Sequence, residues 1–335
     1  MESTLDQLFL TLADQNFITY LLANGTLPYS LPGISFEALP SFYPTPFARR
    51  TFRVQTSLDT HYLLKFNQDG NKIHREVAIC NWLRKNENHF FYVPAIISWD
   101  AEDEHTNPAH VHWLLGEWVA SRSTVGSLKS FPEHPEQIIS GLVWLNKLRL
   151  KMLDVQAIFR MHLPQADILL EFMNRRRNVA FEAFFEICDS KTKNVFQSLQ
   201  QAVASYPFTK RIGLVHGDFH LNNVLLSFDP VKPKFTWIDW EDATMDHPLS
   251  DLAHLLVFEE FSPPSLAFME LFLQTYNRDN RKENQLSKKE VWLLAAVWLT
   301  RMVGWNLRMQ TGDKRSIIEK QAVQSAQFIF DQMKD

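Results

Sequence analysis

The sequence reads L-V-H-G-D-F-H-L-N-N-V-L-L over residues 214–226 and F-T-W-I-D-W-E over residues 235–241. Each stretch is a short apolar run that leads into a carboxylate, Asp218 in the first and Asp239 in the second, and Asn223 follows Asp218 after four intervening residues. Phosphoryl transfer from ATP uses these groups: one aspartate accepts the proton of the attacking hydroxyl, while an asparagine and a second aspartate hold magnesium. The spacing equals that of the protein-kinase catalytic loop, H-R-D, four residues, then asparagine. The two stretches therefore predict a phosphoryl-transfer site.

Parts of the first stretch allow other interpretations. An aspartate shortly before an asparagine is common in turns, and a histidine in an apolar run is often only packed. His216, Asp218 and His220 alternate, so on a strand they would share a face and could converge on zinc. The zinc interpretation leaves Asn223 and Asp239 without a function, so we favour phosphoryl transfer.

The two motifs resemble those of the aminoglycoside phosphotransferase and choline kinase superfamily, H-G-D-x-x-x-x-N and I-D-[WFY]-E. Residues 246–253, D-H-P-L-S-D-L-A, look like the D-P-x-x-D-L-A segment of the same superfamily. The resemblance implies that Asp218 is the catalytic base, that Asn223 and Asp239 are magnesium ligands, and that His216 is a structural residue of the loop. It also implies an ATP-dependent phosphotransferase that moves the γ-phosphoryl group to a hydroxyl of a small molecule, with Mg²⁺ as cofactor and GTP as the alternative donor.

The implied fold is α+β, a bilobed protein-kinase-like fold with a small antiparallel-sheet N-lobe and a mainly helical C-lobe. We place a nucleotide-binding lobe with a leading helix (4–23) at residues 1–119 and a catalytic and acceptor-binding lobe at 120–335. Residues 34–43, 51–56, 61–67, 90–99 and 111–119 look like strands, and residues 72–85 look like a helix. After residue 120 helical spacing dominates, at residues 135–150, 165–188, 191–206, 246–260, 266–276, 287–309 and 314–333.

The resemblance assigns nucleotide-binding residues in the first lobe. Lys65 stands in an apolar strand and Glu76 in the following helix, the places of the lysine that binds the phosphates and the glutamate that fixes it. Glu76 could equally belong to a solvated helix face. The strand at 111–119 would end in the hinge, where backbone groups from Glu117 to Val119 pair with adenine. An ordinary buried strand would use the same residues.

The loop between the first two strands departs from the family. Residues 43–50, Y-P-T-P-F-A-R-R, contain no glycine, although a glycine there lets backbone amides approach the phosphates. Arg49 and Arg50 could supply charge-assisted hydrogen bonds instead, or both could be solvated. The departure also keeps a second function class open, a catalytically silent kinase-like module that binds a nucleotide or another ligand.

Acceptor-binding residues are predicted past the metal strand and on a late helix that lines the acceptor side in the family. They are His220, Glu241, Asp242, Trp298 and Trp305. Carboxylates and indole faces together favour a cationic acceptor such as an aminoglycoside or a quaternary amine, with sugars as the alternative. The carboxylates could instead cap a turn and the tryptophans could be core. We expect the arginines at 175–177 to form a solvated face rather than an anion site.

Composition narrows the function classes further. The chain has 335 residues, enough for two lobes, with 45% hydrophobic and 21% charged residues. A net charge of -4 gives no electrostatic reason to expect nucleic acid. Cys80 and Cys188 form no disulfide framework or zinc spacing. The acidic N-terminus lacks the basic region of a signal peptide, and the apolar stretch at 291–299 is too short to span a bilayer. We therefore expect a cytoplasmic protein with no membrane partner, of undetermined oligomeric state.

Overall fold

A computed structural model of the chain describes residues 35–39, 49–56, 59–67, 69–86, 89–100, 112–119, 121–124, 135–148, 150, 152–159, 177–208, 211–227, 235–278, 280 and 285–334. The chain divides into two compact units, Met1–Arg122 with Leu226–Asp242, and Ser123–Leu225 with Ala243–Asp335. The division predicted from the sequence has a single boundary. In the structure the segment Leu226–Asp242, which contains the I-D-W-E motif, belongs to the first unit.

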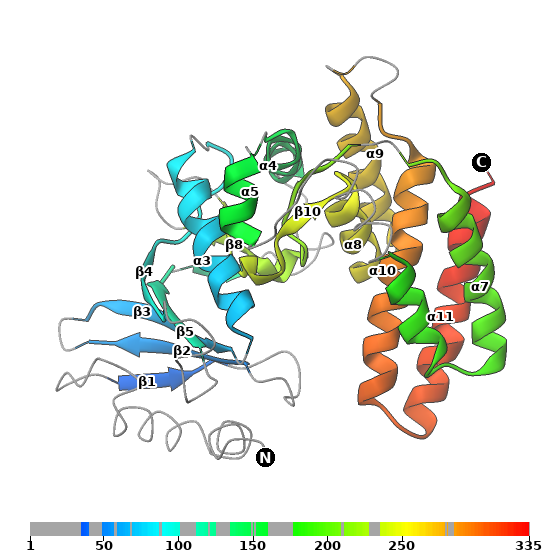
Figure 1. The fold of residues 1–335 in the computed structure, drawn as a ribbon, viewed down its shortest axis with the longest axis horizontal. Coiled ribbons are helices and arrows are strands. Elements are labelled where there is room, and N and C mark those ends of the chain that lie inside the picture. The colour runs from blue at the N-terminus through cyan, green and yellow to red at the C-terminus, as the bar shows by residue number, and fades with distance from the viewer. Residues whose placement is uncertain are drawn as a thin grey trace. The chain divides into compact units, whose positions relative to one another are not determined.

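An antiparallel five-stranded sheet forms the first unit's framework, in the order β1-β2-β3-β5-β4 (Figure 1). The strands are β1 (Ser35–Ala38), β2 (Arg49–Gln55), β3 (His61–Asn67), β4 (Ile96–Trp99) and β5 (His112–Glu117). The helix α3 (Gly70–Lys85) follows β3. It begins after Asp69, because the Asp69 carboxylate caps the first turn by accepting from the amide of Asn71 at 3.0 Å. Its buried face carries Ile73 and Val77, which pack with Leu114 of β5.

The I-D-W-E segment joins the first unit through β9 (Phe235–Trp237). Tyr92 forms an isolated parallel bridge with Thr236. The ring of Phe91 stacks on Trp237 with 3.9 Å between centroids. These contacts fix the end of β9, and the 3-10 turn η3 (Trp240–Asp242) follows directly after Asp239.

Helices dominate the second unit. They are α4 (Pro135–Lys147), α5 (Met152–Phe159), a helical stretch at 177–185, α7 (Ser190–Ser205), α8 (Ser250–Phe258), α9 (Pro263–Asn277), α10 (Lys288–Met309) and α11 (Asp313–Gln332). The helices α7, α10 and α11 pack against one another (Figure 1). A capping box between Ser287 and Glu290 begins α10.

Short strands precede and follow the H-G-D motif in the chain. β7 (Gly213–Val215) pairs antiparallel with β10 (Thr244–Asp246), and the chain passes from β7 into the motif and then into η2 (Leu221–Asn223). Gly213 is required by close packing, since a Cβ there would lie 2.6 Å from the carbonyl oxygen of Asn146 on α4. Two of the three unit boundaries fall within β6 (Ser121–Thr124) and β8 (Val224–Ser227), and the third follows η3 at Asp242.

This mixture of sheet and helices confirms the predicted α+β class, and most predicted elements are present. The predicted strand 90–99 is wrong over its first half, because only residues 96–99 form a regular strand, β4. The helix predicted from residue 246 begins instead at Ser250, because 244–246 pair as β10 and Pro248 has no backbone N–H to extend a helix. The predicted helix 4–23 and residues 165–176 lie outside the described residues. Among the helices of the described part, none is long and apolar enough to cross a membrane.

Candidate active site

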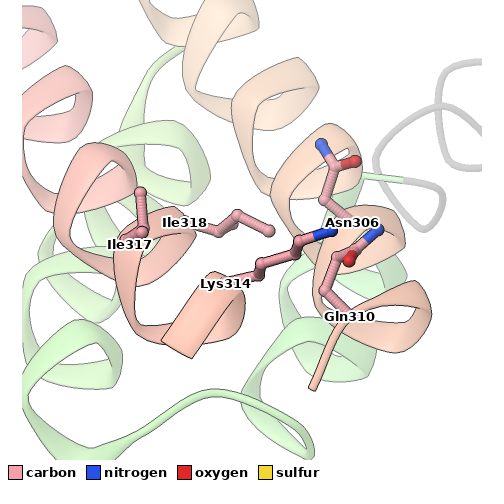
Figure 2. A pocket seen from close by; sticks show the side chains of 5 residues that line it. All are labelled: Asn306, Gln310, Lys314, Ile317 and Ile318. Carbon is pink, nitrogen blue, oxygen red and sulfur yellow. The ribbon is translucent and has the colours of Figure 1, made fainter. Parts of the chain in front are cut away.

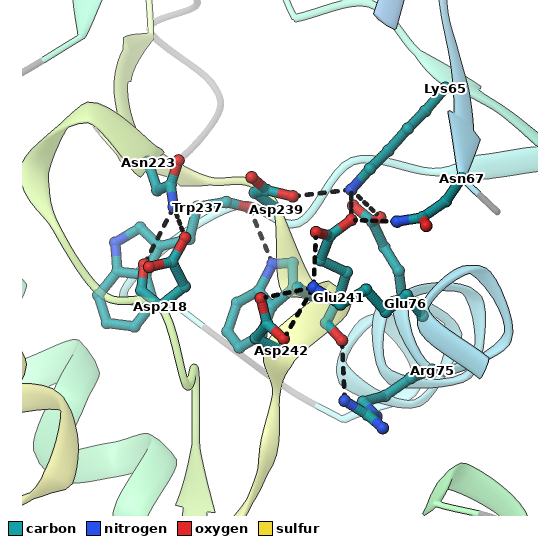
Figure 3. A network of polar contacts seen from close by, with 12 residues as sticks. Lys65, Asn67, Arg75, Glu76, Asp218, Asn223, Trp237, Asp239, Glu241 and Asp242 are labelled. Carbon is teal, nitrogen blue, oxygen red and sulfur yellow. Dashed lines mark hydrogen bonds and ion pairs between the residues drawn. The ribbon is translucent and has the colours of Figure 1, made fainter. Parts of the chain in front are cut away.

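Lys65 lies on β3 with its ammonium group surrounded by carboxylates (Figure 3). Its Nζ is 2.6 Å from Oε2 of Glu76, 2.7 Å from Oδ1 of Asp239 and 2.6 Å from Oε2 of Glu241. The side chain is only 2% exposed, so a lysine here requires opposite charges close by. A strand lysine paired with a glutamate of the next helix is how protein kinases hold the lysine that binds ATP phosphates. The structure thus brings together Lys65, Glu76 and Asp239.

Burial and charge oppose each other at Glu76. The glutamate lies on the buried face of α3, and this burial raises the pKa of Glu76, while the adjacent Lys65 ammonium acts to lower it. A buried ion pair of this kind is costly to break, because the partner left behind is an uncompensated charge. The pair therefore fixes Lys65 in place more than it stabilises the fold.

Glu241 and Asp242 extend the same network. Lys72 Nζ is 3.2 Å from a carboxylate oxygen of each, and Asn67 donates to Glu241 at 3.4 Å. Arg75 donates to the backbone oxygen of Glu241 at 3.1 Å. Burial lowers the pKa of Lys72, but Glu241 and Asp242 outweigh it and raise the pKa overall. The structure thus places both predicted acceptor carboxylates among basic residues of α3 and β3.

Asp239 has a backbone conformation that few residues adopt. Its φ is 68°, in the left-handed region where aspartate is one of the tolerated non-glycine residues. This turn carries the chain sharply from β9 into η3. It lets both Asp239 and Glu241 reach Lys65 although one residue separates them.

Three carboxylates of this network lie close together around the Lys65 ammonium, which is the cation that they share in this structure. One oxygen each of Glu76, Asp239 and Glu241 lies within 4.8 Å of the others, and among the described residues this is the single group of three or more such side chains. Oxygen ligands suit magnesium rather than zinc. His216, Asp218 and His220 form no such group, so the zinc interpretation has no support in this geometry.

Asp218 occupies the loop between β7 and η2. Asn223 Nδ2 donates to its backbone oxygen at 3.0 Å and lies 3.5 Å from its Oδ2. Two imidazoles flank the carboxylate: His220 Nε2 is 3.6 Å from Oδ2 and His254 Nε2 is 3.8 Å from Oδ1. The Asp218 side chain is 34% exposed, which leaves it accessible to a substrate.

The carboxylate of Asp251, on α8, holds this loop through its backbone. Its two carboxylate oxygens accept from the backbone amides of His216 at 2.7 Å and Gly217 at 2.9 Å. Gly217 has a φ of 82°, which favours glycine at this position. Burial raises the pKa of Asp251 to about 7, and the two amide hydrogen bonds act against that rise. The backbone conformation of the H-G-D residues is thus held by hydrogen bonds to α8.

A family model described as the phosphotransferase enzyme family matches residues 43–285, well over half of the chain. The chain belongs to this family. The match contains all the residues of both motifs, and it confirms the family resemblance seen in them.

Solved structures with the same fold include two kinases of small molecules. The microcompartment-associated aminopropanol kinase is 16% identical, with a TM-score of 0.65, and the alignment covers 96% of this chain and 99% of that one. The ethanolamine kinase of Plasmodium vivax is 14% identical, with a TM-score of 0.62 over 96% and 91% of the chains. A GDP complex of aminoglycoside 2'-phosphotransferase-IIIa is 15% identical, with a TM-score of 0.65 over 95% and 99%. These likenesses confirm the protein-kinase-like fold.

A short match relates this chain to much longer proteins. Acyl-CoA dehydrogenase family member 11 of Rattus norvegicus is 52% identical over 46 residues, which are 13% of this chain and 6% of that protein. The human protein of the same name is 48% identical over 46 residues. The aligned segment thus covers only a small part of either relative.

The remaining predicted acceptor residues lie on or near helices of the second unit. His220 stacks on Phe258 of α8 at 4.5 Å between centroids. Trp298 of α10 stacks on His254 at 4.2 Å, and the Arg301 guanidinium lies 4.9 Å from the Trp298 ring. Trp305 is half-buried two turns further along α10. Trp298 is therefore already engaged by internal partners.

The predicted nucleotide residues outside the Lys65 network are only partly described. The amide of Glu117 donates to the Ala95 carbonyl at 2.8 Å, and its carboxylate accepts from Tyr92 at 2.5 Å. These bonds hold the end of β5, from which the chain continues to Val119. The side chains of Arg49 and Arg50 lie outside the described part of the structure.

The prediction of a solvated face for the arginines at 175–177 is wrong for Arg177. This residue is 4% exposed, 3.7 Å from Asp246 and stacked over Phe208 at 4.2 Å. Arg175 and Arg176 lie outside the described residues.

Two residues of α8 that contact the Asp218 loop, Asp251 and His254, were given no role from the sequence. Asp251 stands in the D-L-A segment that resembles the family, so the sequence marked this residue but did not show what it binds. His254 follows it at helical spacing, but an isolated histidine in an apolar helix gives no such signal.

A separate surface pocket of about 340 Å³ lies between α10 and α11 (Figure 2). It is lined by Asn306, Gln310, Lys314, Ile317 and Ile318. The lining holds one charged group and no carboxylate or imidazole, so it offers no catalytic groups.

Proposed function

We propose that the chain is a kinase that transfers the γ-phosphoryl group of ATP to a hydroxyl of a small molecule, with Asp218 as the general base. Asp218 is exposed enough to meet a substrate, and it accepts the hydroxyl proton as the oxygen attacks phosphorus. Lys65 binds the phosphates. Family membership and the kinase fold support this proposal.

The main support for the kinase proposal is the buried contact of Lys65 with both Glu76 and Asp239. A structural lysine would need only one carboxylate, whereas here the ammonium also faces the aspartate of the I-D-W-E motif. In protein kinases the corresponding lysine must be held by its glutamate for phosphates to bind productively.

The ligands suit magnesium. Asp239 and Asn223 are the residues we propose to hold it, because carboxylate and amide oxygens are ligands that suit a hard cation. When bound, magnesium neutralises charge on the phosphate oxygens. The contacts of Glu241 with Lys65 and Lys72 favour a role on this phosphate side in place of the predicted acceptor role.

The acceptor class is drawn from the fold relatives, whose names specify aminopropanol, ethanolamine and an aminoglycoside. We propose an acceptor of the amino-alcohol, aminoglycoside or sugar type. A cationic acceptor has weaker support than the sequence suggested, because the Trp298 ring already contacts Arg301 and His254.

The test is a phosphoryl-transfer assay with ATP and with GTP across amino-alcohols, aminoglycosides and sugars, with magnesium and with a chelator. We expect transfer to at least one class, and only with the metal. Asp239→Ala should abolish magnesium-dependent nucleotide binding, whereas Asp313→Ala, an exposed acid at the start of α11, should leave it unchanged. Nucleotide binding without transfer to any acceptor would favour a silent binding module instead.

A further inference from the structure

His254 faces the same loop as Asp251. The two residues lie three positions apart on α8, so they share one face of the helix. Asp251 binds the backbone amides of His216 and Gly217, and His254 directs Nε2 towards Oδ1 of Asp218 at 3.8 Å. The helix therefore meets the loop twice, once at its backbone and once at the carboxylate that we assign as the base.

The imidazole of His254 is held rigidly. It is 4% exposed and stacks on Trp298 with an interplanar angle of 19°. Trp298 is itself fixed, because its indole N–H donates to Ser250 Oγ at 3.2 Å and the Arg301 guanidinium lies over its ring. A ring stacked in this way has a fixed plane, so its edge has a fixed direction.

The contacts assign the ring proton to Nε2. Nδ1 is buried and has no hydrogen-bond partner within the described part of the chain, whereas Nε2 faces a carboxylate. An N–H directed at a carboxylate is attractive, and a lone pair directed at it is repulsive. Burial also lowers the pKa of His254 to about 4, so the ring is neutral near pH 7.

We propose that His254 is a positioning residue for Asp218: its neutral Nε2–H orients the carboxylate so that the lone pairs it does not engage face the acceptor hydroxyl. This inference rests on the proposed function. At 3.8 Å the contact is longer than a hydrogen bond, and catalytic contacts of this kind often shorten only when substrate is bound. A neutral donor orients the carboxylate without adding a fixed opposite charge beside it.

The first test needs no acceptor. The ¹⁵N resonances of the His254 ring, assigned by their loss in His254→Gln, should report a neutral ring protonated at Nε2. Asp218→Asn should shift the Nε2 resonance, and the control Asp313→Asn should not. A ring protonated at Nδ1, or a resonance that Asp218→Asn leaves unchanged, would overturn the contact.

The second test compares two replacements that keep different halves of the side chain. His254→Gln keeps an N–H near the Nε2 position but loses the ring, whereas His254→Phe keeps a flat ring to stack on Trp298 but has no N–H. Positioning predicts that kcat falls at least about tenfold in the Phe variant and less in the Gln variant, with the KM for ATP unchanged in both. If the Phe variant is the more active, His254 has only a packing role.

A double variant separates this inference from the proposed function. In an Asp218→Asn background, His254→Phe should lower the residual kcat no further, because it acts through Asp218. An additive loss would overturn the positioning role. If the wild-type protein transfers phosphoryl to no acceptor, the proposed function fails, and the NMR arm still decides whether His254 holds Asp218.

Discussion

The Lys65 network and the Asp218 loop hold their key groups by different means. Lys65 is 2% exposed and touches three carboxylates at 2.6 to 2.7 Å. Asp218 is 34% exposed and faces an amide and two imidazoles at 3.5 to 3.8 Å. The first is a dense set of opposite charges, and the second is an accessible carboxylate with loosely placed polar neighbours.

The difference matches the two proposed roles, phosphate binding for Lys65 and proton acceptance for Asp218. A residue that binds phosphate must keep its charge and position, and close buried carboxylates ensure both. A general base must gain and lose a proton, and a strong opposite charge at short distance would hold it in the ionised form. We therefore expect substitutions in the Lys65 network to affect folding and nucleotide binding, and those around Asp218 to affect turnover.

Lys65→Met should have the largest effect. It removes the ammonium that Glu76, Asp239 and Glu241 share, and leaves buried carboxylates close together. We expect a loss of about 3–5 kcal/mol in the free energy of unfolding, measured by urea denaturation. Nucleotide affinity should fall with it.

The matched control is Lys288→Met. Lys288 pairs with Glu270 on the surface, where both side chains are largely exposed. Such a pair contributes about 0–1 kcal/mol, so this variant should unfold almost as the wild type does. Equal losses in the two lysine variants would contradict the distinction between the buried network and an ordinary ion pair.

Asp218→Asn tests the other side of the comparison. The amide keeps the shape of the side chain but cannot accept a proton, so kcat should fall by about 10² or more. Nucleotide affinity and unfolding should be unchanged, because the substitution leaves the Lys65 network intact. Titration with ATP and a kcat measurement decide it: near-normal turnover would remove Asp218 from the role of base.

The features of the fold and site that could be predicted were those that a short stretch of sequence defines. The spacing of Asp218 and Asn223, and the strand and helix that carry Lys65 and Glu76, were recognisable because each lies in one short motif or periodic segment. The contact of Lys65 with Asp239 joins residues 174 positions apart, and no local pattern shows that Glu241 shares it. The stack of His254 on Trp298 is likewise a contact between two helices, visible only after folding.

The pH dependence of stability should reveal how His254 is held. Its pKa is about 4 in the folded protein, below the ordinary value of 6.5, so the unfolded chain binds the proton more readily. The stabilising contribution is therefore complete above about pH 6.5 and is lost as the pH falls towards 4, by up to about 3 kcal/mol. His254→Gln should remove this part of the slope. Parallel curves of unfolding free energy against pH for the two proteins would show that the imidazole is not held neutral by burial.

The smallest expected effect concerns the glycine-free loop before β2. The register pairs Arg49 with Asn67, Arg50 with Phe66 and Thr51 with Lys65. Because directly opposed residues share a face and the faces alternate along a strand, Arg49 has the register position of the face that holds Lys65. We expect Arg49→Ala to weaken ATP binding by about 1–3 kcal/mol, as for a lost hydrogen bond to a charged group, and Arg50→Ala to change it little. Nucleotide titration of both variants measures this. A loss confined to Arg50→Ala would reverse the assignment, and negligible losses in both would show that the loop does not bind phosphate through arginine.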